Sequence, residues 1–257
     1  FESYDKCEEL IRDAIKIGDG DQGSFEIFTE LEKLLEEDYR HPVPTGVDGL
    51  DNILNGGLAK GEIGVILAPT GVGKTTMLTR FANTAFNMGY NVLQIFFEDN
   101  PKIIQRKHFT CWTGIPNDKL SEHKETVLDK ADEMKKTGGK LILKKLPSDE
   151  MSMLQIKNQV RKIISEGTKI DMILIDYIDC ILPDRAFNDE WKGEGSVMRK
   201  FEGMCHELNI AGWTATQGNR TSISSEVVTT DMMGGSIKKA QVGHVIISVA
   251  KTLQQKE

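Results

Sequence analysis

The stretch VILAPTGVGKTTML, Val65 to Leu78, joins an apolar run to a turn with two glycines and then to a helix-like pattern. Its central part, APTGVGKT, has the spacing of a phosphate-binding Walker A loop, except that Ala68 stands in place of the first glycine. A strand before the loop and a helix from Lys74 onward form the context that this motif requires. The stretch therefore predicts a nucleoside-triphosphate site in an α/β fold.

The loop residues have separate chemical roles. Backbone N–H groups from Gly71 to Thr75, together with the helix N-terminus, would surround the phosphates, and Gly73 leaves room for a close approach. Lys74 would reach the β- and γ-phosphates, and Thr75 would hold Mg²⁺. The competing interpretation is a glycine turn without a ligand. The predicted nucleotide-binding residues are Gly71, Val72, Gly73, Lys74, Thr75 and Thr76, of which Thr76 also suits an ordinary helix position.

A second carboxylate-bearing strand supports the Mg²⁺ prediction. DMILIDYID contains four apolar residues, Met172–Ile175, followed by Asp176, which is the Walker B pattern. We therefore expect Asp176 and Thr75 to form the metal site. Asp171 precedes the strand and is expected to be solvated, whereas Asp179 lies past its tip and remains a candidate substrate-side residue.

Hydrolysis also needs a group that orients or deprotonates water. In VLQIFFEDNPK, Glu98 ends a predicted strand, and Asn100 and Pro101 suit an N-cap and a first helical turn. Glu98 is thus the predicted base, while Asp99 suits a helix-dipole role. Gln217 ends the strand in TATQGNR and is predicted to sense the γ-phosphate; the alternative is a polar strand-end residue without a role. The predicted catalytic residues are Glu98, Lys74 and Gln217.

Short apolar runs alternate with amphipathic segments along the rest of the chain, which predicts a mostly parallel sheet with helices on both faces. The expected strands are Ile63–Ala68, Val92–Phe97, Lys140–Leu146, Met172–Asp176, Gly212–Gln217 and His244–Val249. The expected helices are Lys74–Met88, Pro101–Thr113, Lys119–Lys136, Ser152–Ser165 and Val197–Leu208. Trp112 and Trp213 are expected in the packing of this domain rather than in a binding site.

Composition limits the remaining functions. The four cysteines are far apart, which argues against a zinc site or a disulfide framework, and no apolar run approaches the roughly 18 residues of a membrane span, so we expect a cytoplasmic protein without membrane contact. Residues 1–40 contain 13 acidic and 5 basic side chains, whereas the remainder contains 26 and 27. We therefore predict an acidic helical segment, 1–40, which is either a linker arm or a pair of helices packed on its own domain, and a larger domain, 41–257, that can carry a basic groove.

The motifs together resemble the RecA-like ATPase domain of DnaB-type replicative helicases. PTGVDGLDNILNGGLAKGE, APTGVGKTT, FFED, ILIDYIDCI, ATQGNR and GGSIKKAQVGHVIIS occur in the order of that family over roughly residues 41–250. The resemblance implies a RecA-like P-loop fold, ATP and Mg²⁺ as ligands, and a hexameric ring that unwinds duplex while moving on single-stranded DNA. It also implies primase or helicase-loader partners, and host cytoplasm if the protein is phage-encoded.

The chain departs from the family pattern in two places. Lys238 and Lys239 stand where the family has acidic residues after GSI, and the basic Lys/Arg-x-Arg stretch expected after the last strand is missing. We therefore expect the carboxyl-terminal end of the domain to be incomplete, and the amino-terminal domain of the family to be absent from these 257 residues.

DNA contacts are expected from two long polar segments, Arg185–Ser196 and Asn219–Lys239. The candidate DNA-binding residues are Arg185, Lys192, Arg220, Lys238 and Lys239. Three other functions compete with the helicase interpretation: a RecA/RadA-type recombinase, a KaiC-like regulatory ATPase, and a scaffold that binds ATP without hydrolysing it. Glu98 argues against the scaffold.

Overall fold

A computed structural model describes residues 28, 35, 40–148, 150–183, 190–219, 222, 225, 227–233, 239 and 241–251, leaving aside the side chains of Glu190, Trp191 and Asp231. The chain divides into two compact units, Phe1–Tyr39 and Arg40–Glu257. The fold described below is that of the second unit.

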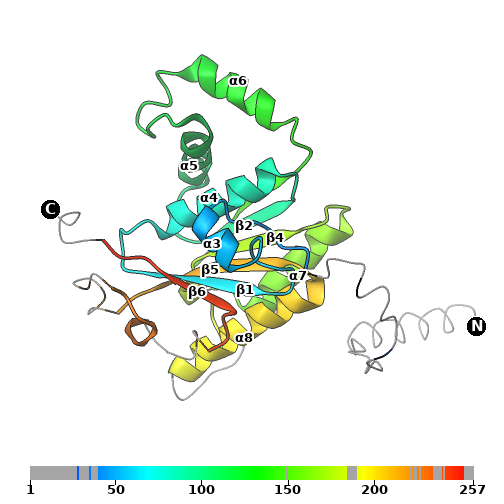
Figure 1. Cartoon of the computed structure of the whole chain (residues 1–257), viewed down its shortest axis with the longest axis vertical. Helices are drawn as coiled ribbons and strands as arrows, with labels where there is room; N and C mark the ends of the chain where they lie inside the picture. The colour runs from blue at the N-terminus through cyan, green and yellow to red at the C-terminus, as the bar shows by residue number, and fades with distance from the viewer. Residues whose placement is uncertain are drawn as a thin grey trace, which may run out of the picture. The chain divides into compact units, whose positions relative to one another are not determined.

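A six-stranded parallel sheet forms the centre of this unit (Figure 1). The strands are β1 (Ile63–Ala68), β2 (Val92–Phe96), β3 (Leu141–Lys145), β4 (Met172–Asp176), β5 (Ala211–Gln217) and β6 (Val245–Ser248). Their order is β3-β2-β4-β5-β1-β6, and every pair is parallel. The predicted sheet is confirmed, and each predicted strand agrees with the structure to within one residue at either end. Because the strands are parallel, their carboxyl ends meet at one edge of the sheet.

Helices cover both faces of the sheet (Figure 1). They are α3 (Asp48–Ile53), α4 (Lys74–Asn87), α5 (Pro101–Thr113), α6 (Lys124–Met134), α7 (Met153–Ser165) and α8 (Glu190–Leu208), with single 3₁₀ turns η1 (Ile178–Cys180) and η2 (Thr230–Met232). Asn100 caps α5 by accepting a hydrogen bond from the Lys102 N–H (2.9 Å), as predicted. Ser152 and Gln155 form a reciprocal capping box at the start of α7.

Two of the predicted helix boundaries were wrong. Helix α6 begins at Lys124 rather than at Lys119, because the residues before it form turns. Helix α8 begins at Glu190, so most of the segment expected to be a DNA-contacting loop before Val197 is helical. Gly193 and Gly195 weaken the helix signal in the sequence, and both are buried in the first turns of α8.

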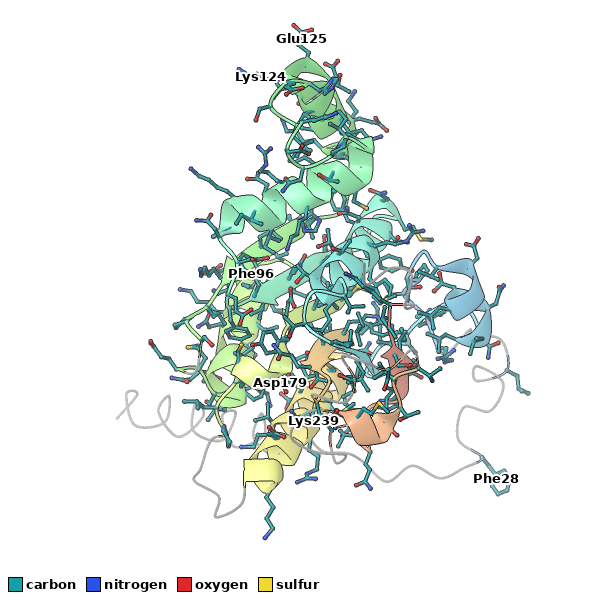
Figure 2. All side chains as sticks on the ribbon, turned by 90° about the vertical axis from the view of Figure 1, so that its left-hand side faces the viewer. Phe28, Phe96, Lys124, Glu125, Asp179 and Lys239 are labelled. Atoms are coloured by element: carbon teal, nitrogen blue, oxygen red, sulfur yellow. The ribbon has the colours of Figure 1, made fainter. Side chains whose placement is uncertain are left out.

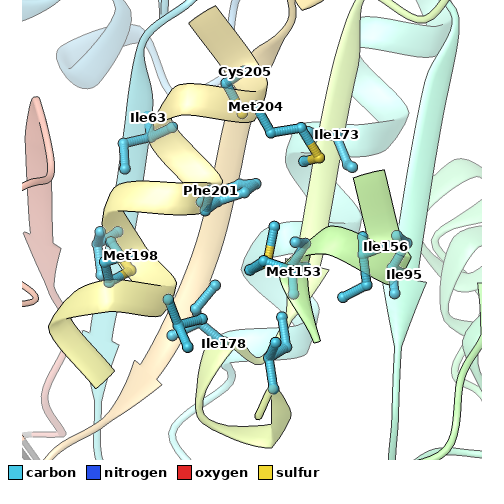
Figure 3. Packing of buried hydrophobic residues seen from close by; sticks show 14 of the residues in the cluster. Ile63, Ile95, Met153, Ile156, Ile173, Ile178, Met198, Phe201, Met204 and Cys205 are labelled. Carbon is cyan, nitrogen blue, oxygen red and sulfur yellow. The ribbon is translucent and has the colours of Figure 1, made fainter. Parts of the chain in front are cut away.

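Each face of the sheet has its own core. On one face, α7 and α8 pack Met153, Ile156 and Phe201 against alternate residues of the strands, including Ile63 of β1 (Figure 3). On the other face, α4 packs against Ile66 and the neighbouring strand residues. The sheet is therefore buried on both sides, which explains why its strands appear as continuous apolar runs in the sequence.

Trp213 lies at the centre of the second core, as expected of a packing residue. It is fully buried, and its ring centroid lies 4.8 Å from that of Phe81 on α4. The indole occupies the space above Gly64 of β1, where a Cβ atom would lie 2.3 Å from the ring. Only glycine fits at position 64 for this reason, and β1 is thereby held close to α4.

Asp171 corrects a further expectation, because it is 7 % exposed rather than solvated. Its carboxylate accepts hydrogen bonds from the Lys60 ammonium (2.8 Å) and from the Asn91 N–H (3.0 Å). These contacts join the amino end of β4 to the segments that precede β1 and β2. Within the described residues, no helix is both long and apolar enough to cross a membrane.

Candidate nucleotide site

The loop between β1 and α4 turns on two glycines. Gly71 (φ 77°) and Gly73 (φ 107°) adopt left-handed backbone conformations that strain other residues. Gly73 also directly precedes α4, and it has no side chain that could cap the N–H groups of the first helical turn. These N–H groups and the positive end of the helix dipole are the features that bind a phosphate.

Lys74, the first residue of α4, extends its side chain back over the loop. Its Nζ donates hydrogen bonds to the carbonyl oxygens of Ala68 (3.0 Å) and Pro69 (3.1 Å). Partial burial lowers the pKa of Lys74 below its ordinary value, and nearby carboxylates, most of all Asp176, oppose this shift. The ammonium is thus positioned over the loop to meet an anion.

Asp176 ends β4 and accepts a hydrogen bond from the Thr75 side chain. Burial raises the pKa of Asp176, and the Thr75 hydrogen bond and the charge of Lys107 limit the rise. A hydroxyl oxygen and a carboxylate oxygen side by side are ligands of the kind that Mg²⁺ prefers. The two residues predicted to hold the metal therefore lie together and suit it chemically.

Glu98 follows β2 and is exposed at the carboxyl edge of the sheet. The Tyr177 hydroxyl donates a hydrogen bond to its Oε1 (2.9 Å). Burial and this hydrogen bond raise the pKa of Tyr177 above its ordinary value. Tyr177 thereby fixes the orientation of the Glu98 carboxylate.

Asp99 and Lys107 form an ion pair at the start of α5, with Nζ and Oδ2 2.7 Å apart. Both side chains are roughly one-third exposed. Asp99 was expected only to complement the dipole of α5, whereas the structure pairs it with a lysine two helical turns further along. Both charges act on Asp176, where Lys107 lowers the pKa of the carboxyl and Asp99 raises it.

A cavity of about 310 Å³ brings these groups together. The sheet order places the ends of β2, β4, β5 and β1 side by side, so residues that are distant in sequence line one space. The lining residues are Thr70, Gly71, Gly73, Lys74, Thr75, Thr76, Phe96, Glu98, Asp99, Lys107, Asp176, Tyr177 and Gln217. Of the predicted nucleotide and catalytic residues, only Val72 lies elsewhere; it lines a neighbouring cavity of about 640 Å³.

The sequence did not identify Tyr177 and Lys107 as members of this site. Tyr177 directly follows the Walker B aspartate, which is a signal that could have been used. Lys107 is one of several basic residues in α5, and only the three-dimensional packing distinguishes it from the others.

The candidate DNA-binding residues have different positions. Arg185, Arg220 and Lys238 lie outside the described residues. Lys192 is exposed, but on the first turns of α8 rather than in a loop. Lys239 corrects the expectation of a solvent-facing residue, because its side chain is 3 % exposed and its ammonium pairs with two partly buried carboxylates. In this arrangement the Lys239 ammonium faces these carboxylates rather than solvent.

Comparison with known families agrees with this geometry. The sequence profile of the DnaB-like helicase C terminal domain matches residues 42–232. Two solved structures have the same fold. One is described as an ATPase domain and has a TM-score of 0.72 at 17 % identity, over 86 % of this chain and 80 % of that one. The other is a DnaB-like replicative helicase described with its interactions with primase, and it has a TM-score of 0.78 at 16 % identity, over 100 % of this chain and 68 % of that one.

Curated relatives come from two groups of proteins. The DNA repair protein RadA of Aquifex aeolicus is 30 % identical over 131 residues, which are 51 % of this chain and 26 % of RadA. The replicative DNA helicase DnaB of Helicobacter pylori is 24 % identical over 212 residues, which are 79 % of this chain and 43 % of DnaB. The chain thus spans less than half the length of these relatives.

Proposed function

Because the chain belongs to the DnaB-like helicase C-terminal domain family, we propose that it is the motor of a replicative DNA helicase. The motor hydrolyses Mg²⁺-ATP and uses the energy to move on single-stranded DNA and to unwind duplex within a hexameric ring. The observation that carries this proposal is the meeting of Lys74, Asp176, Glu98 and Gln217 in one cavity at the carboxyl edge of the sheet.

Binding of the triphosphate relies on the loop before α4. The N–H groups between Gly71 and Thr75 hold the phosphate oxygens, and Lys74 exchanges its hydrogen bonds to Ala68 and Pro69 for phosphate oxygens. Thr75 and Asp176 would hold the Mg²⁺ ion. Bound there, Mg²⁺ neutralises charge on the β- and γ-phosphates.

Hydrolysis requires a water molecule in line with the bond that breaks. Glu98 orients this water and accepts its proton as oxygen attacks the γ-phosphorus, and the bond to the β-phosphate oxygen breaks to give ADP and phosphate. The Tyr177 hydroxyl holds Glu98 in place through the 2.9 Å hydrogen bond. Gln217, which lines the same cavity from the end of β5, contacts the γ-phosphate and responds to its loss.

DNA binding is electrostatic and independent of sequence in this proposal. Exposed Lys192, together with Arg185, Arg220 and Lys238, contacts backbone phosphates of a single strand. A primase or a helicase loader would be the protein partner, since one of the similar structures is described with primase.

A RadA-type DNA repair function is the second candidate. The RadA of Aquifex aeolicus matches at a higher identity than the DnaB of Helicobacter pylori, 30 % against 24 %, although over a shorter segment. The two functions are separated by giving the full-length protein a labelled fork with single-stranded tails on both arms, and in parallel a pair of homologous DNA molecules. We expect ATP-dependent separation of the fork by the wild type and none by the Glu98→Gln variant. Joint molecules without unwinding would favour the RadA-type function. ATP hydrolysis that is not stimulated by single-stranded DNA, together with no strand separation, would overturn the proposal.

A further inference from the structure

Asp179 lies in η1, just past the tip of β4, and its carboxylate has partners from two distant parts of the chain. It accepts hydrogen bonds from the Thr216 hydroxyl (3.1 and 3.0 Å to its two oxygens) and from the Gln217 N–H (3.2 Å). It also pairs with the ammonium group of Lys239, and the two side chains lie side by side in Figure 2. One carboxylate thus holds both ends of the segment between Gln217 and Lys239.

Lys239 also connects this carboxylate to α8. Its ammonium lies 3.2 Å from Glu194 Oε2, and its side chain is 3 % exposed, while those of Asp179 and Glu194 are 20 % and 23 % exposed. Burial of an ammonium between two carboxylates is costly unless the geometry satisfies all three groups. Loss of the ammonium alone would leave two like charges facing each other at this position.

The charged cluster of Asp179, Lys239 and Glu194 lies directly beside the nucleotide site. All three residues line a cavity of about 350 Å³ that is separate from the nucleotide cavity. The two cavities share Glu98, Tyr177 and Gln217. A displacement of the cluster therefore acts first on Gln217, whose backbone N–H is held by Asp179.

We propose that Asp179 and Lys239 are positioning residues for Gln217. Asp179 fixes the end of β5 so that the Gln217 amide reaches the terminal phosphate of bound ATP. Lys239 holds the Asp179 carboxylate in position through their ion pair. The proposal rests on the proposed function, since it requires that Gln217 contacts ATP. It predicts that breaking the pair impairs turnover and leaves the affinity for ADP unchanged.

The test uses the full-length protein and three variants of the cluster: Lys239→Met, Asp179→Asn, and the double variant Asp179→Asn/Lys239→Gln, which replaces the ion pair by two neutral amides. Steady-state ATP hydrolysis gives kcat and KM, and a fluorescent ADP analogue gives the product affinity. We expect Lys239→Met to lower kcat roughly 10- to 100-fold, the scale of a small misplacement of a reacting group, with ADP affinity within about twofold. The double variant should recover most of the loss, because the ion pair is replaced as a unit.

Two comparisons distinguish positioning from a general structural role. In the Gln217→Ala background, Lys239→Met should lower kcat by less than about twofold further, since effects on one shared contact are not additive. Lys60→Met is the matched control: it breaks a largely buried Lys–Asp pair, with 2.8 Å between Lys60 Nζ and Asp171, at the opposite end of β4. This control should lower the melting temperature without changing kcat.

The outcomes are separable. Unchanged kcat in Lys239→Met, a parallel loss of ADP affinity, or full additivity with Gln217→Ala would each overturn the positioning role. If Lys239→Met does not fold, the double variant decides: near-normal kcat that stays sensitive to Gln217→Ala supports the role, and a low kcat contradicts it. Absence of ATP hydrolysis in the wild type would instead refute the proposed function itself.

Discussion

Acidification should destabilise the domain through a single buried histidine, His108 of α5. The side chain is 1 % exposed, and burial lowers its pKa from 6.5 to about 4. Its Nδ1 lies 2.6 Å from Asn83 Oδ1, and its Nε2 lies 3.0 Å from the Gln94 amide oxygen. A neutral imidazole carries only one N–H, so one of these contacts needs a donor from the amide. Rotation of the Gln94 amide supplies that donor and gives its otherwise unpartnered Nε2 a partner.

The magnitude follows from the two pKa values. Since the folded-state pKa is depressed, the unfolded chain binds more protons between pH 6.5 and 4, and stability falls as the pH falls through this window. The loss is about 2 kcal/mol between pH 7 and pH 5, and it approaches about 3 kcal/mol below pH 4. Well above pH 6.5 the ring is neutral in both the folded and the unfolded state, and His108 no longer makes stability depend on pH.

Urea unfolding at pH 7 and pH 5 measures this effect. A His108→Gln variant has no titrating ring at this position, so the difference between the two proteins removes the contribution of all other groups. The wild type should lose about 2 kcal/mol more than His108→Gln between the two pH values. Equal losses would show that His108 titrates with an ordinary pKa, and the reasoning from burial would be wrong.

Three further predictions concern the site, the core and DNA. Glu98→Gln should keep Mg²⁺-ATP binding while turnover falls about 10²- to 10⁴-fold, whereas Lys74→Ala should weaken binding itself. Titration with a fluorescent nucleotide measures binding and steady-state kinetics measure turnover, and near-normal turnover by Glu98→Gln would contradict its assignment as the base. Gly64→Val places a side chain where the buried indole ring lies, and it should lower the free energy of unfolding by about 1–3 kcal/mol in urea; unchanged stability would contradict the packing argument. Lys192→Ala should reduce the slope of log affinity for single-stranded DNA against log salt concentration by about 0.7. The control is Lys124→Ala, which removes an exposed lysine of α6 (Figure 2) and should leave the slope unchanged. Equal slopes for the two variants would place Lys192 outside the DNA contact.

The sequence was sufficient for the sheet and for most residues at its carboxyl edge. Strands buried on both faces leave continuous apolar runs, and polar residues such as Asp176 and Gln217 mark the points at which the runs end. In a parallel sheet these ends share one edge, so local sequence patterns were enough to predict which residues lie close together there.

The errors arose where a distant partner decides the environment of a residue. Lys239 stands in a polar, glycine-bearing segment, which suggests solvent exposure. Its side chain is nevertheless buried against Asp179, which lies 60 positions earlier in the sequence. Asp171 is buried for the same reason, through Lys60. The start of α8 was missed because Gly193 and Gly195 lower its helix propensity, and their burial is not apparent from the sequence.

The assembly of one cavity from the ends of β1, β2, β4 and β5 ties ligand binding to the folding equilibrium of the whole sheet. The lining side chains extend in sequence from Thr70 to Gln217, so the long-range pairings among these four strands must form before a nucleotide can be held. A ligand that binds only the folded chain at a concentration of 100 times its Kd adds about 2.7 kcal/mol to the free energy of unfolding. The cellular nucleotide pool would then stabilise the folded sheet, and a chain that has released its nucleotide would unfold more readily than one that holds it.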